Sequence, residues 1–241
     1  MPTLNIIIIG AGRMGQAVKK EAEAQGHNVL AIIDLDGAGW DLLEAKKADL
    51  AIEFVGPASA AGVVRRCLAA GVPIVSGSTG WDKELEEVKV YADSIGGTML
   101  HARNFSLGIN FLKDICERLG RFLDTQPGFQ LRLEEVHHVH KLDSPSGTAI
   151  TLAGWLTSAS SRLNGWATAE MESGQSERIQ IQVLRAPDVV GVHTIILESA
   201  TEHLQFTHTA KDRSVFAAGA VAAAAWLAHK KGIFSMANVL E

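Results

Sequence analysis

Leu4-Asn5-Ile6-Ile7-Ile8-Ile9-Gly10-Ala11-Gly12-Arg13-Met14-Gly15 joins a short apolar run directly to a glycine-rich turn. The apolar run has the length of a buried strand, and the residues at 16–25 read as a helix. Gly10 permits the tight turn, Gly12 lets a ligand approach the backbone, and Gly15 lets the helix pack closely on the strand. Strand, turn and helix in this order predict the start of a doubly wound α/β domain.

A second apolar strand is expected at 28–33, and it ends in Asp34. A glycine loop alone is weak evidence of a function. A glycine loop between a strand and a helix, with an acidic residue about twenty positions later, is much stronger evidence of a dinucleotide site. We therefore predict that residues 10–15 bind a dinucleotide and that Asp34 accepts hydrogen bonds from its adenosine ribose.

The residue after Asp34 bears on the choice between NADH and NADPH. It is Leu35, at a place where a cation would be needed to pair with the 2′-phosphate of NADPH. A carboxylate beside that phosphate is repulsive, so the sequence favours NADH. Arg13, inside the glycine loop, would compensate in part and allow NADPH as well.

Alternating strand and helix patterns continue to about residue 104 and predict a parallel sheet with helices on both faces. Strands are expected at 50–54, 73–75 and 98–101, and helices at 58–70 and 82–94. A turn that contains Gly77, Ser78 and Thr79 follows the strand at 73–75. Doubly wound sheets bind their ligands at such carboxyl ends of strands.

The second half of the chain has a different pattern. Residues 129–137 alternate apolar and polar side chains, as a half-buried strand does, and a helix is expected at 146–163 with Ser146 as its N-cap. A polar stretch follows at 164–177. Three more alternating segments, at 179–184, 191–197 and 202–208, predict an open sheet of mixed or antiparallel strands. The fold class is therefore α/β, with a second α+β domain.

Three histidines and a lysine lie between that strand and that helix. They are His137, His138, His140 and Lys141, and the helix start supplies N–H donors beside them. This combination suits an anion, and a substrate that carries a carboxylate is the natural candidate. Two other interpretations stay open, a solvated polar loop and a metal site. We predict no metal, because no cysteine lies nearby and a lysine would oppose a cation.

Composition excludes several classes of protein. The chain has 241 residues and a formal net charge of −5, which argues against a nucleic-acid partner. No apolar run reaches membrane-spanning length, so no membrane association is expected. Cys67 and Cys116 are far apart and provide no disulfide framework, so both are expected to be small core residues. We expect a cytoplasmic protein.

The run His137-His138-x-His140-Lys141-x-Asp143-x-Pro145-Ser146-Gly147-Thr148-Ala149 resembles the signature of the 4-hydroxy-tetrahydrodipicolinate reductase (dihydrodipicolinate reductase) family. The resemblance covers nearly the whole chain, although the part between Asp34 and residue 50 is short. It implies reduction of 4-hydroxy-tetrahydrodipicolinate to tetrahydrodipicolinate by NADH or NADPH with loss of water, in the diaminopimelate route to lysine.

The resemblance also implies roles for individual residues. His137 and Lys141 would be the acid–base pair, and His138, Gly147 and Thr148 would bind the dicarboxylate substrate. Gly77, Ser78 and Thr79 would contact the cofactor. The segment Ala102, Arg103, Asn104 and Phe105 resembles the family's crossover beside the nicotinamide ring, with Arg103 in place of a small residue.

The alanine-rich helix expected at 214–230 would return to the first domain, as in the resembling family. The dinucleotide-binding domain would then comprise residues 1–104 and 214–241. Residues 105–213 would form the domain for substrate binding and oligomerisation, and the family resemblance implies a homotetramer.

Two rival functions remain. Another two-domain dehydrogenase of the aspartate dehydrogenase type would share the glycine loop but should lack the full run from His137 to Thr148. A non-catalytic nucleotide sensor of the same fold should have a degraded cluster, whereas here the cluster is complete.

Overall fold

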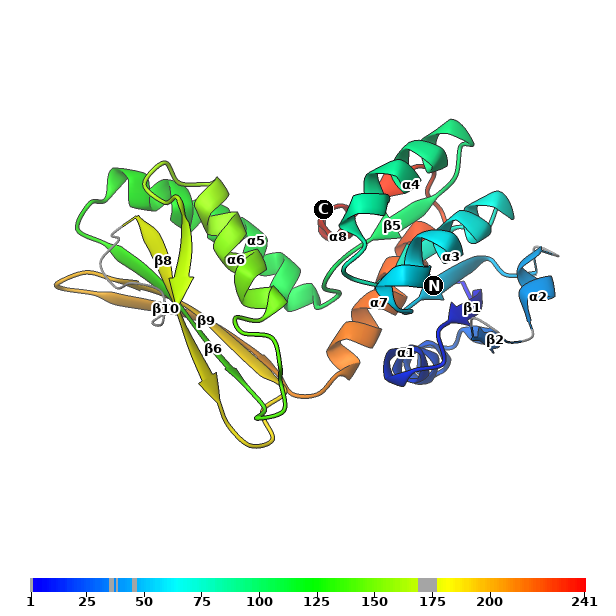
Figure 1. Cartoon of the computed structure of the whole chain (residues 1–241), viewed down its shortest axis with the longest axis horizontal. Coiled ribbons are helices and arrows are strands. Elements are labelled where there is room, and N and C mark those ends of the chain that lie inside the picture. The colour runs from blue at the N-terminus through cyan, green and yellow to red at the C-terminus, as the bar shows by residue number, and fades with distance from the viewer. Residues whose placement is uncertain (1, 35–36, 38, 45–46, 169–176) are drawn as a thin grey trace. The chain divides into compact units, whose positions relative to one another are not determined.

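The computed structural model describes the whole chain except residues 1, 35–36, 38, 45–46 and 169–176. It divides into two compact units (Figure 1). Unit 1 comprises Met1–Asn110 and Arg213–Glu241, and unit 2 comprises Phe111–Asp212. Among the described residues, no helix is both long and apolar enough to cross a membrane.

Unit 1 contains a parallel sheet with the strand order β11-β5-β4-β3-β1-β2. The strands are β1 (Asn5–Ile9), β2 (Asn28–Ile33), β3 (Leu50–Glu53), β4 (Ile74–Ser76), β5 (Met99–His101) and β11 (Ile233–Phe234). This architecture confirms the predicted Rossmann-type domain. The sequence did not predict β11, because two residues are too short to show a strand period.

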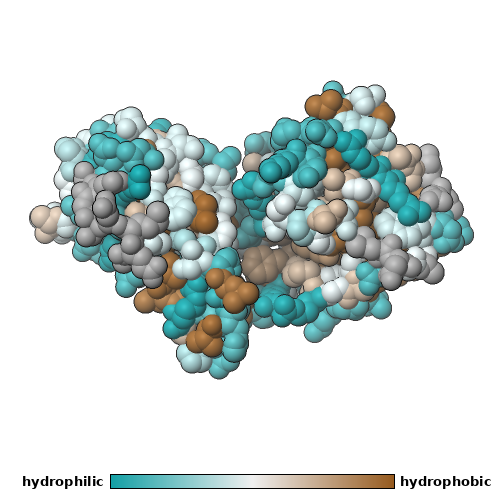
Figure 2. All heavy atoms as spheres, in the orientation of Figure 1, coloured by the Kyte–Doolittle hydropathy of each residue, from teal (hydrophilic) through white to brown (hydrophobic). Residues whose placement is uncertain are grey.

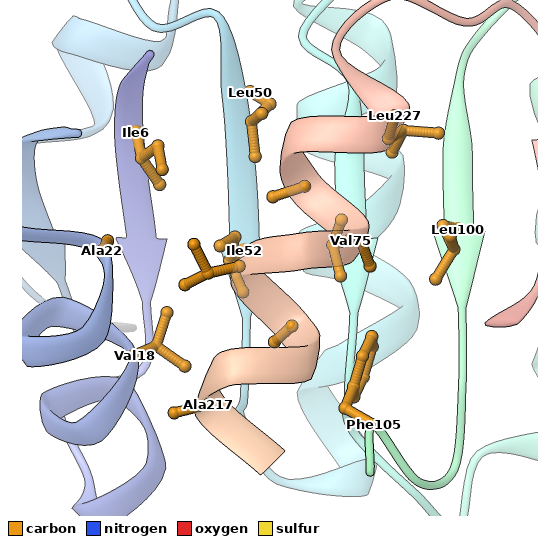
Figure 3. Packing of buried hydrophobic residues seen from close by; sticks show 14 of the residues in the cluster. Ile6, Val18, Ala22, Leu50, Ile52, Val75, Leu100, Phe105, Ala217 and Leu227 are labelled. Carbon is orange, nitrogen blue, oxygen red and sulfur yellow. The ribbon is translucent and has the colours of Figure 1, made fainter. Parts of the chain in front are cut away.

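Helices cover both faces of this sheet. They are α1 (Arg13–Ala24), α2 (Trp40–Glu44), α3 (Pro57–Ala69), α4 (Asp82–Ser94), α7 (Ser214–Leu227) and α8 (Met236–Leu240). Alternate residues of β1 face opposite sides, as the period of a strand requires. Ile6 and Ile8 lie in the core formed with α1 and α7 (Figure 3), whereas Ile7 and Ile9 lie in the core formed with α3 and α4. All four are fully buried, and each contributes about 1.5–3 kcal/mol to folding.

Helix α7 joins unit 1 from the far end of the chain, and a glycine makes the contact close. A Cβ atom on Gly219 would lie 1.7 Å from the carbonyl oxygen of Phe105. Only glycine therefore lets α7 reach the segment that follows β5.

The predicted core role of the two cysteines is confirmed as well. Cys67 and Cys116 are fully buried, and burial raises the pKa of each thiol to about 12.

Unit 2 contains a mixed sheet with the strand order β10-β9-β6-β8-β7. The strands are β6 (Gln130–His137), β7 (Gly165–Thr168), β8 (Arg178–Arg185), β9 (Gly191–Glu198) and β10 (His203–Ala210). Strand β8 is parallel to β6 and β7, while β9 is antiparallel to β6 and β10. Helices α5 (Leu107–Thr125) and α6 (Gly147–Ser158) lie along one face (Figure 1). The predicted open mixed sheet is confirmed.

Two boundaries in unit 2 differ from the sequence prediction. Helix α6 ends at Ser158 rather than at residue 163, because Asp124 of α5 captures the following chain. The hydroxyl of Ser160 donates to Asp124 Oδ1 at 2.6 Å, and the N–H of Ser161 donates to Oδ2 at 2.9 Å. In addition, strand β7 lies within the polar stretch at 164–177, where the sequence predicts no strand. Residues 169–176 of that stretch are outside the described residues.

Candidate active site

The glycine loop has the geometry that its sequence predicts. Gly10 has a φ of 105°, and a Cβ there would lie 2.3 Å from the carbonyl oxygen of Phe54. A Cβ on Gly15 would lie 1.9 Å from the carbonyl oxygen of Gly10, so both positions need glycine. A Cβ on Gly12 would have no atom within 4 Å, and Ala11 and Arg13 are exposed. Because α1 begins without a side-chain cap on Gly12, its first N–H groups are available to an anion.

The other predicted cofactor residues follow the carboxyl ends of neighbouring strands. Asp34 is exposed directly after β2, residues 77–79 follow β4, and residues 102–105 follow β5. Since these strands are parallel, all these ends lie at one edge of the sheet. The sheet order changes direction between β1 and β3, and such switch points are where doubly wound sheets bind ligands. Leu35, on which the cofactor preference depends, lies outside the described residues.

The turn after β4 is hydrogen-bonded to a buried carboxyl group that the sequence did not predict as part of the site. Glu53, the last residue of β3, is fully buried. Its carboxyl oxygens are hydrogen-bonded to the hydroxyls of Ser76 and Ser78, and the N–H of Val55 donates to Oε2 at 3.1 Å. Burial raises the pKa of Glu53, although these hydrogen bonds act in the opposite direction. An acidic residue at the end of one apolar strand, followed by serines at the end of the next strand, is the signal that could have identified this group.

The position of Ser78 agrees with a protonated Glu53. The Ser78 hydroxyl lies 2.6 Å from Glu53 Oε2 and 2.8 Å from the carbonyl oxygen of Val55, and it accepts from the Val55 N–H. One hydroxyl proton cannot serve both oxygens. A protonated Glu53 that donates to Ser78 leaves Ser78 free to donate to Val55. The side chain of Ser78 is therefore turned into unit 1, while Thr79 is exposed and Gly77 is half-buried.

The segment after β5 combines a buried aromatic residue with an exposed cation. Phe105 is 2% exposed and packs edge-on against Phe54, with ring centroids 5.8 Å apart. Ala102 is buried and Asn104 is half-buried. Arg103, whose role the sequence left open, is exposed and pairs with Asp82 of α4 through Nη2 and Oδ1 at 2.6 Å. An exposed pair of this kind adds little stability.

In unit 2, strand register brings together residues that are far apart in sequence. Glu135 of β6 is paired with His193 of β9, and His137 of β6 is paired with Arg185 of β8. Residues 135 and 137 point to the same face because side chains alternate along a strand. Glu135 is fully buried, and His137 and His193 are each 6% exposed.

The two buried imidazoles are neutral groups beside this carboxylate. His137 Nδ1 and His193 Nε2 each lie 3.8 Å from Glu135 Oε2, and Arg185 Nη1 lies 3.6 Å from Glu135 Oε1. Burial lowers the pKa of His193 to about 3. Burial also lowers the pKa of His137, Glu135 acts to raise it, and Lys141 and Arg185 act to lower it further.

The loop after β6 carries the remaining cationic residues. Lys141 Nζ lies 2.8 Å from Asp143 Oδ1, and the Lys141 N–H donates to the carbonyl of His138. His138 is half-buried and His140 is exposed, with their ring centroids 6.3 Å apart. Figure 2 shows hydrophobic side chains among the hydrophilic ones where this loop lies, and Leu142 is 98% exposed.

Helix α6 begins as the sequence predicts. Ser146 is its N-cap, and the Ser146 hydroxyl accepts from the N–H of Ala149 at 3.1 Å. Gly147 is exposed and Thr148 is half-buried in the first turn. The Asp143 carboxylate is partly buried, which acts to raise its pKa, but its contacts with Lys141 and the Gly147 N–H lower the pKa overall. Asp143 thus binds the Lys141 ammonium and the Gly147 N–H, which the sequence predicts as donors to a substrate carboxylate.

A metal site can be considered for Glu135, His137 and His193, whose potential ligand atoms lie within 4.8 Å of one another. This set differs from the three neighbouring histidines of the sequence. The two oxygens of Glu135 already accept from the N–H of Ser146, each at 3.1 Å, and Arg185 and Lys141 add positive charge. These contacts disfavour a cation, and the absence of a metal stays a prediction.

The chain matches family models over nearly its whole length. The model described as dihydrodipicolinate reductase, N-terminus, matches residues 4–105, and the model described as dihydrodipicolinate reductase, C-terminus, matches residues 108–240. A protein of Christiangramia forsetii named 4-hydroxy-tetrahydrodipicolinate reductase is 36% identical over 238 residues, covering 99% of this chain and 98% of its own length. A protein of Bdellovibrio bacteriovorus with the same name is 35% identical and covers 100% of this chain and 97% of its own length.

Solved structures share the fold. The dihydrodipicolinate reductase of Paenisporosarcina sp. TG-14, solved with dipicolinate bound, superposes with a TM-score of 0.82 at 19% identity and covers 99% of this chain and all of its own. The aspartate dehydrogenase of Thermotoga maritima has a TM-score of 0.51 at 13% identity, with coverage of 94% and 97%. The matched residues of the family models, together with the identity of full-length relatives, show that the chain belongs to the dihydrodipicolinate reductase family.

Proposed function

We propose that this chain reduces 4-hydroxy-tetrahydrodipicolinate to tetrahydrodipicolinate, with loss of water, in the diaminopimelate route to lysine. The observation that carries the proposal is the connection from β6 to α6. It places His137 at the end of β6, Lys141 in the loop that follows, and Gly147 and Thr148 in the first turn of α6. Relatives that are 35–36% identical, and that the chain covers over 97–98% of their length, have the name of this activity.

Lys141 and the start of α6 would bind the substrate. The ammonium of Lys141 now pairs with Asp143, and a substrate carboxylate would replace Asp143 there as the partner. The backbone of Gly147 and the hydroxyl of Thr148 lie in the first turn of α6, where N–H groups favour an anion. His138, half-buried beside them, would contact the same substrate. A solved relative with dipicolinate bound supports a dicarboxylate as the ligand class.

His137 and Lys141 would supply the proton that accompanies reduction. A nicotinamide cofactor, when bound, supplies a hydride to C4 of the substrate ring. Loss of water leaves a conjugated imine, and hydride addition then places electron density on a ring atom that must be protonated. A positioned acid with a suitable pKa accelerates such a proton transfer. The overall reaction consumes one hydride and one proton and releases water.

The glycine loop, Asp34 and the segments 77–79 and 102–105 would hold the cofactor. Support comes from their shared place at the carboxyl edge of the unit 1 sheet and from the geometry of Gly10 and Gly15. We further propose that NADH is used better than NADPH, because Asp34 repels a 2′-phosphate and the next residue is uncharged. Arg13 is exposed in the loop and would permit some use of NADPH.

The proposal includes a homotetramer in the cytoplasm. Helices α5 and α6 lie along one face of the unit 2 sheet (Figure 1), and a second copy would cover the other face. Size-exclusion chromatography with light scattering measures this state directly. A monomer at micromolar concentration would contradict it.

Three assays with the purified chain test the function. In the first, a synthase generates hydroxy-tetrahydrodipicolinate in place, and the loss of NADH or NADPH absorbance is followed. In the second, oxaloacetate and ammonia replace that substrate, which tests an aspartate-type dehydrogenase. In the third, cofactor binding is measured without a substrate. Turnover only in the first assay supports the proposal, turnover only in the second contradicts it, and binding without any turnover indicates a nucleotide sensor. The ratio of KM values for the two cofactors tests the preference for NADH.

A further inference from the structure

A buried carboxylate behind the proposed catalytic loop has no role in the reaction as described so far. Glu135 lies on β6 with its side chain fully buried. Both of its oxygens accept from the backbone N–H of Ser146, each at 3.1 Å. Because Ser146 caps α6, this contact ties the strand that ends in His137 to the helix that begins with Gly147 and Thr148.

His193 strengthens the same junction from the neighbouring strand. Its Nε2 lies 3.1 Å from the Ser146 hydroxyl, which also accepts from the N–H of Ala149. Burial holds the pKa of His193 at about 3, so its imidazole is neutral at ordinary pH. Ser146 is therefore held at its N–H by Glu135 and at its hydroxyl by His193.

His137 faces the same carboxylate with an unused nitrogen. Within the described part of the chain, His137 Nδ1 is buried and has no hydrogen-bond partner, and Glu135 Oε2 is 3.8 Å away. That separation exceeds a hydrogen bond, but contacts of catalytic groups often shorten when the substrate binds. On the other side of the ring, a Cβ on Gly191 would lie 3.1 Å from Nε2, so a larger residue at 191 would press on the imidazole.

Opposing charges surround His137. Glu135 on β6 and Asp143 in the loop favour its protonated form, whereas Lys141 in the loop, Arg185 on β8 and burial disfavour it. His193 of β9 stacks edge-on at 4.9 Å and is neutral. A dicarboxylate bound at Lys141 would offset the ammonium, so that burial and Arg185 would be the influences left to oppose Glu135.

We propose that Glu135 is a positioning residue for the proposed reduction, which holds the His137 imidazole with its Nδ1–H toward the carboxylate and fixes the start of α6 through Ser146. The inference rests on the proposed function. A buried carboxylate that orients a histidine and stabilises its protonated form acts in this way in other acid–base sites. Glu135 itself touches neither substrate nor cofactor.

The first test compares Glu135→Gln with wild type. Glutamine keeps the shape and one acceptor for the Ser146 N–H but removes the charge. We expect kcat to fall about 10–100-fold, the usual effect of removing an outer partner of a functional histidine. Activity that needs protonated His137 is lost as pH rises, so the alkaline limb of the kcat/KM profile should move to lower pH in the variant. The Kd for NADH should be unchanged.

Glu134→Gln is the matched control, because Glu134 is the next residue on β6, points to the opposite face and pairs with Arg132. It should leave the pH profile of wild type in place. An unchanged kcat and pH profile in Glu135→Gln would overturn the proposal, and so would an equal change in both variants. If wild type does not turn over the substrate at all, the proposed function fails instead, and the two failures are distinguishable.

A second measurement uses only the wild-type chain and does not depend on the folding of a variant. Nitrogen chemical shifts of ¹⁵N-histidine-labelled protein report which ring nitrogen has the proton. The proposal expects His137 in the Nδ1–H form when neutral. A bare Nδ1 with the proton on Nε2 overturns it. Adding zinc to the same sample tests the metal alternative: loss or shift of the His137 and His193 signals at equimolar zinc would assign the three side chains to a metal and also overturn the proposal.

Discussion

Each unit has a fully buried glutamate in its sheet beside a turn with a predicted function, but the surroundings of the two glutamates differ. Glu53 in unit 1 is surrounded by hydroxyl and N–H groups of Ser76, Ser78 and Val55. Glu135 in unit 2 faces two imidazoles, a guanidinium and one N–H group. Neutral donors satisfy a carboxyl group without compensating its charge, whereas cationic neighbours also favour the charged form.

This difference indicates different roles for the two glutamates. A carboxyl group among neutral donors is suited to hold backbone segments together, and Glu53 links the ends of β3 and β4 under the Gly77–Thr79 turn. A carboxylate beside imidazoles can influence their proton affinity, and Glu135 lies beside the histidine that we propose as acid. We therefore propose a structural role for the buried acid of unit 1 and a role in the reaction for the buried acid of unit 2.

The largest expected effect is a loss of kcat without a loss of stability, and it concerns Lys141 in unit 2. Lys141→Ala should lower kcat by about two to four orders of magnitude, the range for a lost acid–base or charge-stabilising group. The side chain lies on a loop and pairs only with the exposed Asp143 among the contacts described, so the melting temperature should hardly change. Steady-state kinetics and calorimetry on the same sample measure both. Lys113→Ala, on the surface of α5, is the control, and a near-normal kcat for Lys141→Ala would remove this lysine from the mechanism.

The next effect concerns Glu53 and should appear in stability. Glu53→Ala removes the buried carboxyl group that links Ser76, Ser78 and Val55, so the free energy of unfolding of unit 1 should fall by about 2–4 kcal/mol. Urea titration followed by tryptophan fluorescence measures this loss. Glu23→Ala, at an exposed position of α1, should have little effect. Stability equal to wild type would show that the network beneath the turn is not structural.

A smaller effect is expected at the start of α6. Thr148→Val keeps the shape but removes one hydroxyl that we propose binds a substrate carboxylate, a loss of about 1.5–3 kcal/mol in kcat/KM for the substrate. The Kd for NADH should not change, because its proposed site is in unit 1. Thr151→Val is the control one turn later, since the Thr151 hydroxyl donates to the carbonyl of Gly147 inside the helix. A lower melting temperature with normal substrate kinetics would make Thr148 a purely structural residue.

The smallest expected effect is the pH dependence of stability at Glu53. Burial raises the pKa of Glu53 in the folded chain, so the folded state retains a proton that the unfolded state releases. The stability from this proton is present below the unfolded pKa of about 4.3 and is lost as pH rises through the folded pKa, with a slope of at most about 1.4 kcal/mol per pH unit. Relative to wild type, Glu53→Gln should therefore become more stable as pH rises above about 4.3. Unfolding titrations across this range would contradict the account if the difference between the two proteins stayed constant or changed in the opposite direction.

The sequence predicted those features that depend on neighbours along the chain. Strand β1, the glycine loop and the Ser146 cap were correct because their causes lie within a few residues. The end of α6 was wrong because Asp124, on another helix, captures Ser160 and Ser161. The strand β7 was missed because its stability comes from pairing with β8 rather than from its own pattern.

The same reasoning explains what the sequence missed in the candidate site. His137, Lys141 and Thr148 belong to one continuous run, so the family resemblance identified them together. Glu135 lies two residues before that run, but its contacts with His193 and Arg185 arise from the register of three strands, which no local pattern reveals. A charged residue at an inward position of an alternating strand was the available signal.

The most direct test of the central claim, that this chain transfers a hydride to the ring of a dicarboxylate, follows the hydride itself. NADH labelled with deuterium at C4, in each of its two stereochemical forms, is incubated with the chain and synthase-generated hydroxy-tetrahydrodipicolinate, and the product is examined by mass spectrometry and NMR. The account predicts that one of the two labelled forms delivers its deuterium to C4 of tetrahydrodipicolinate. Oxidation of NADH with no deuterium in the product from either form, or no product at all, would contradict it.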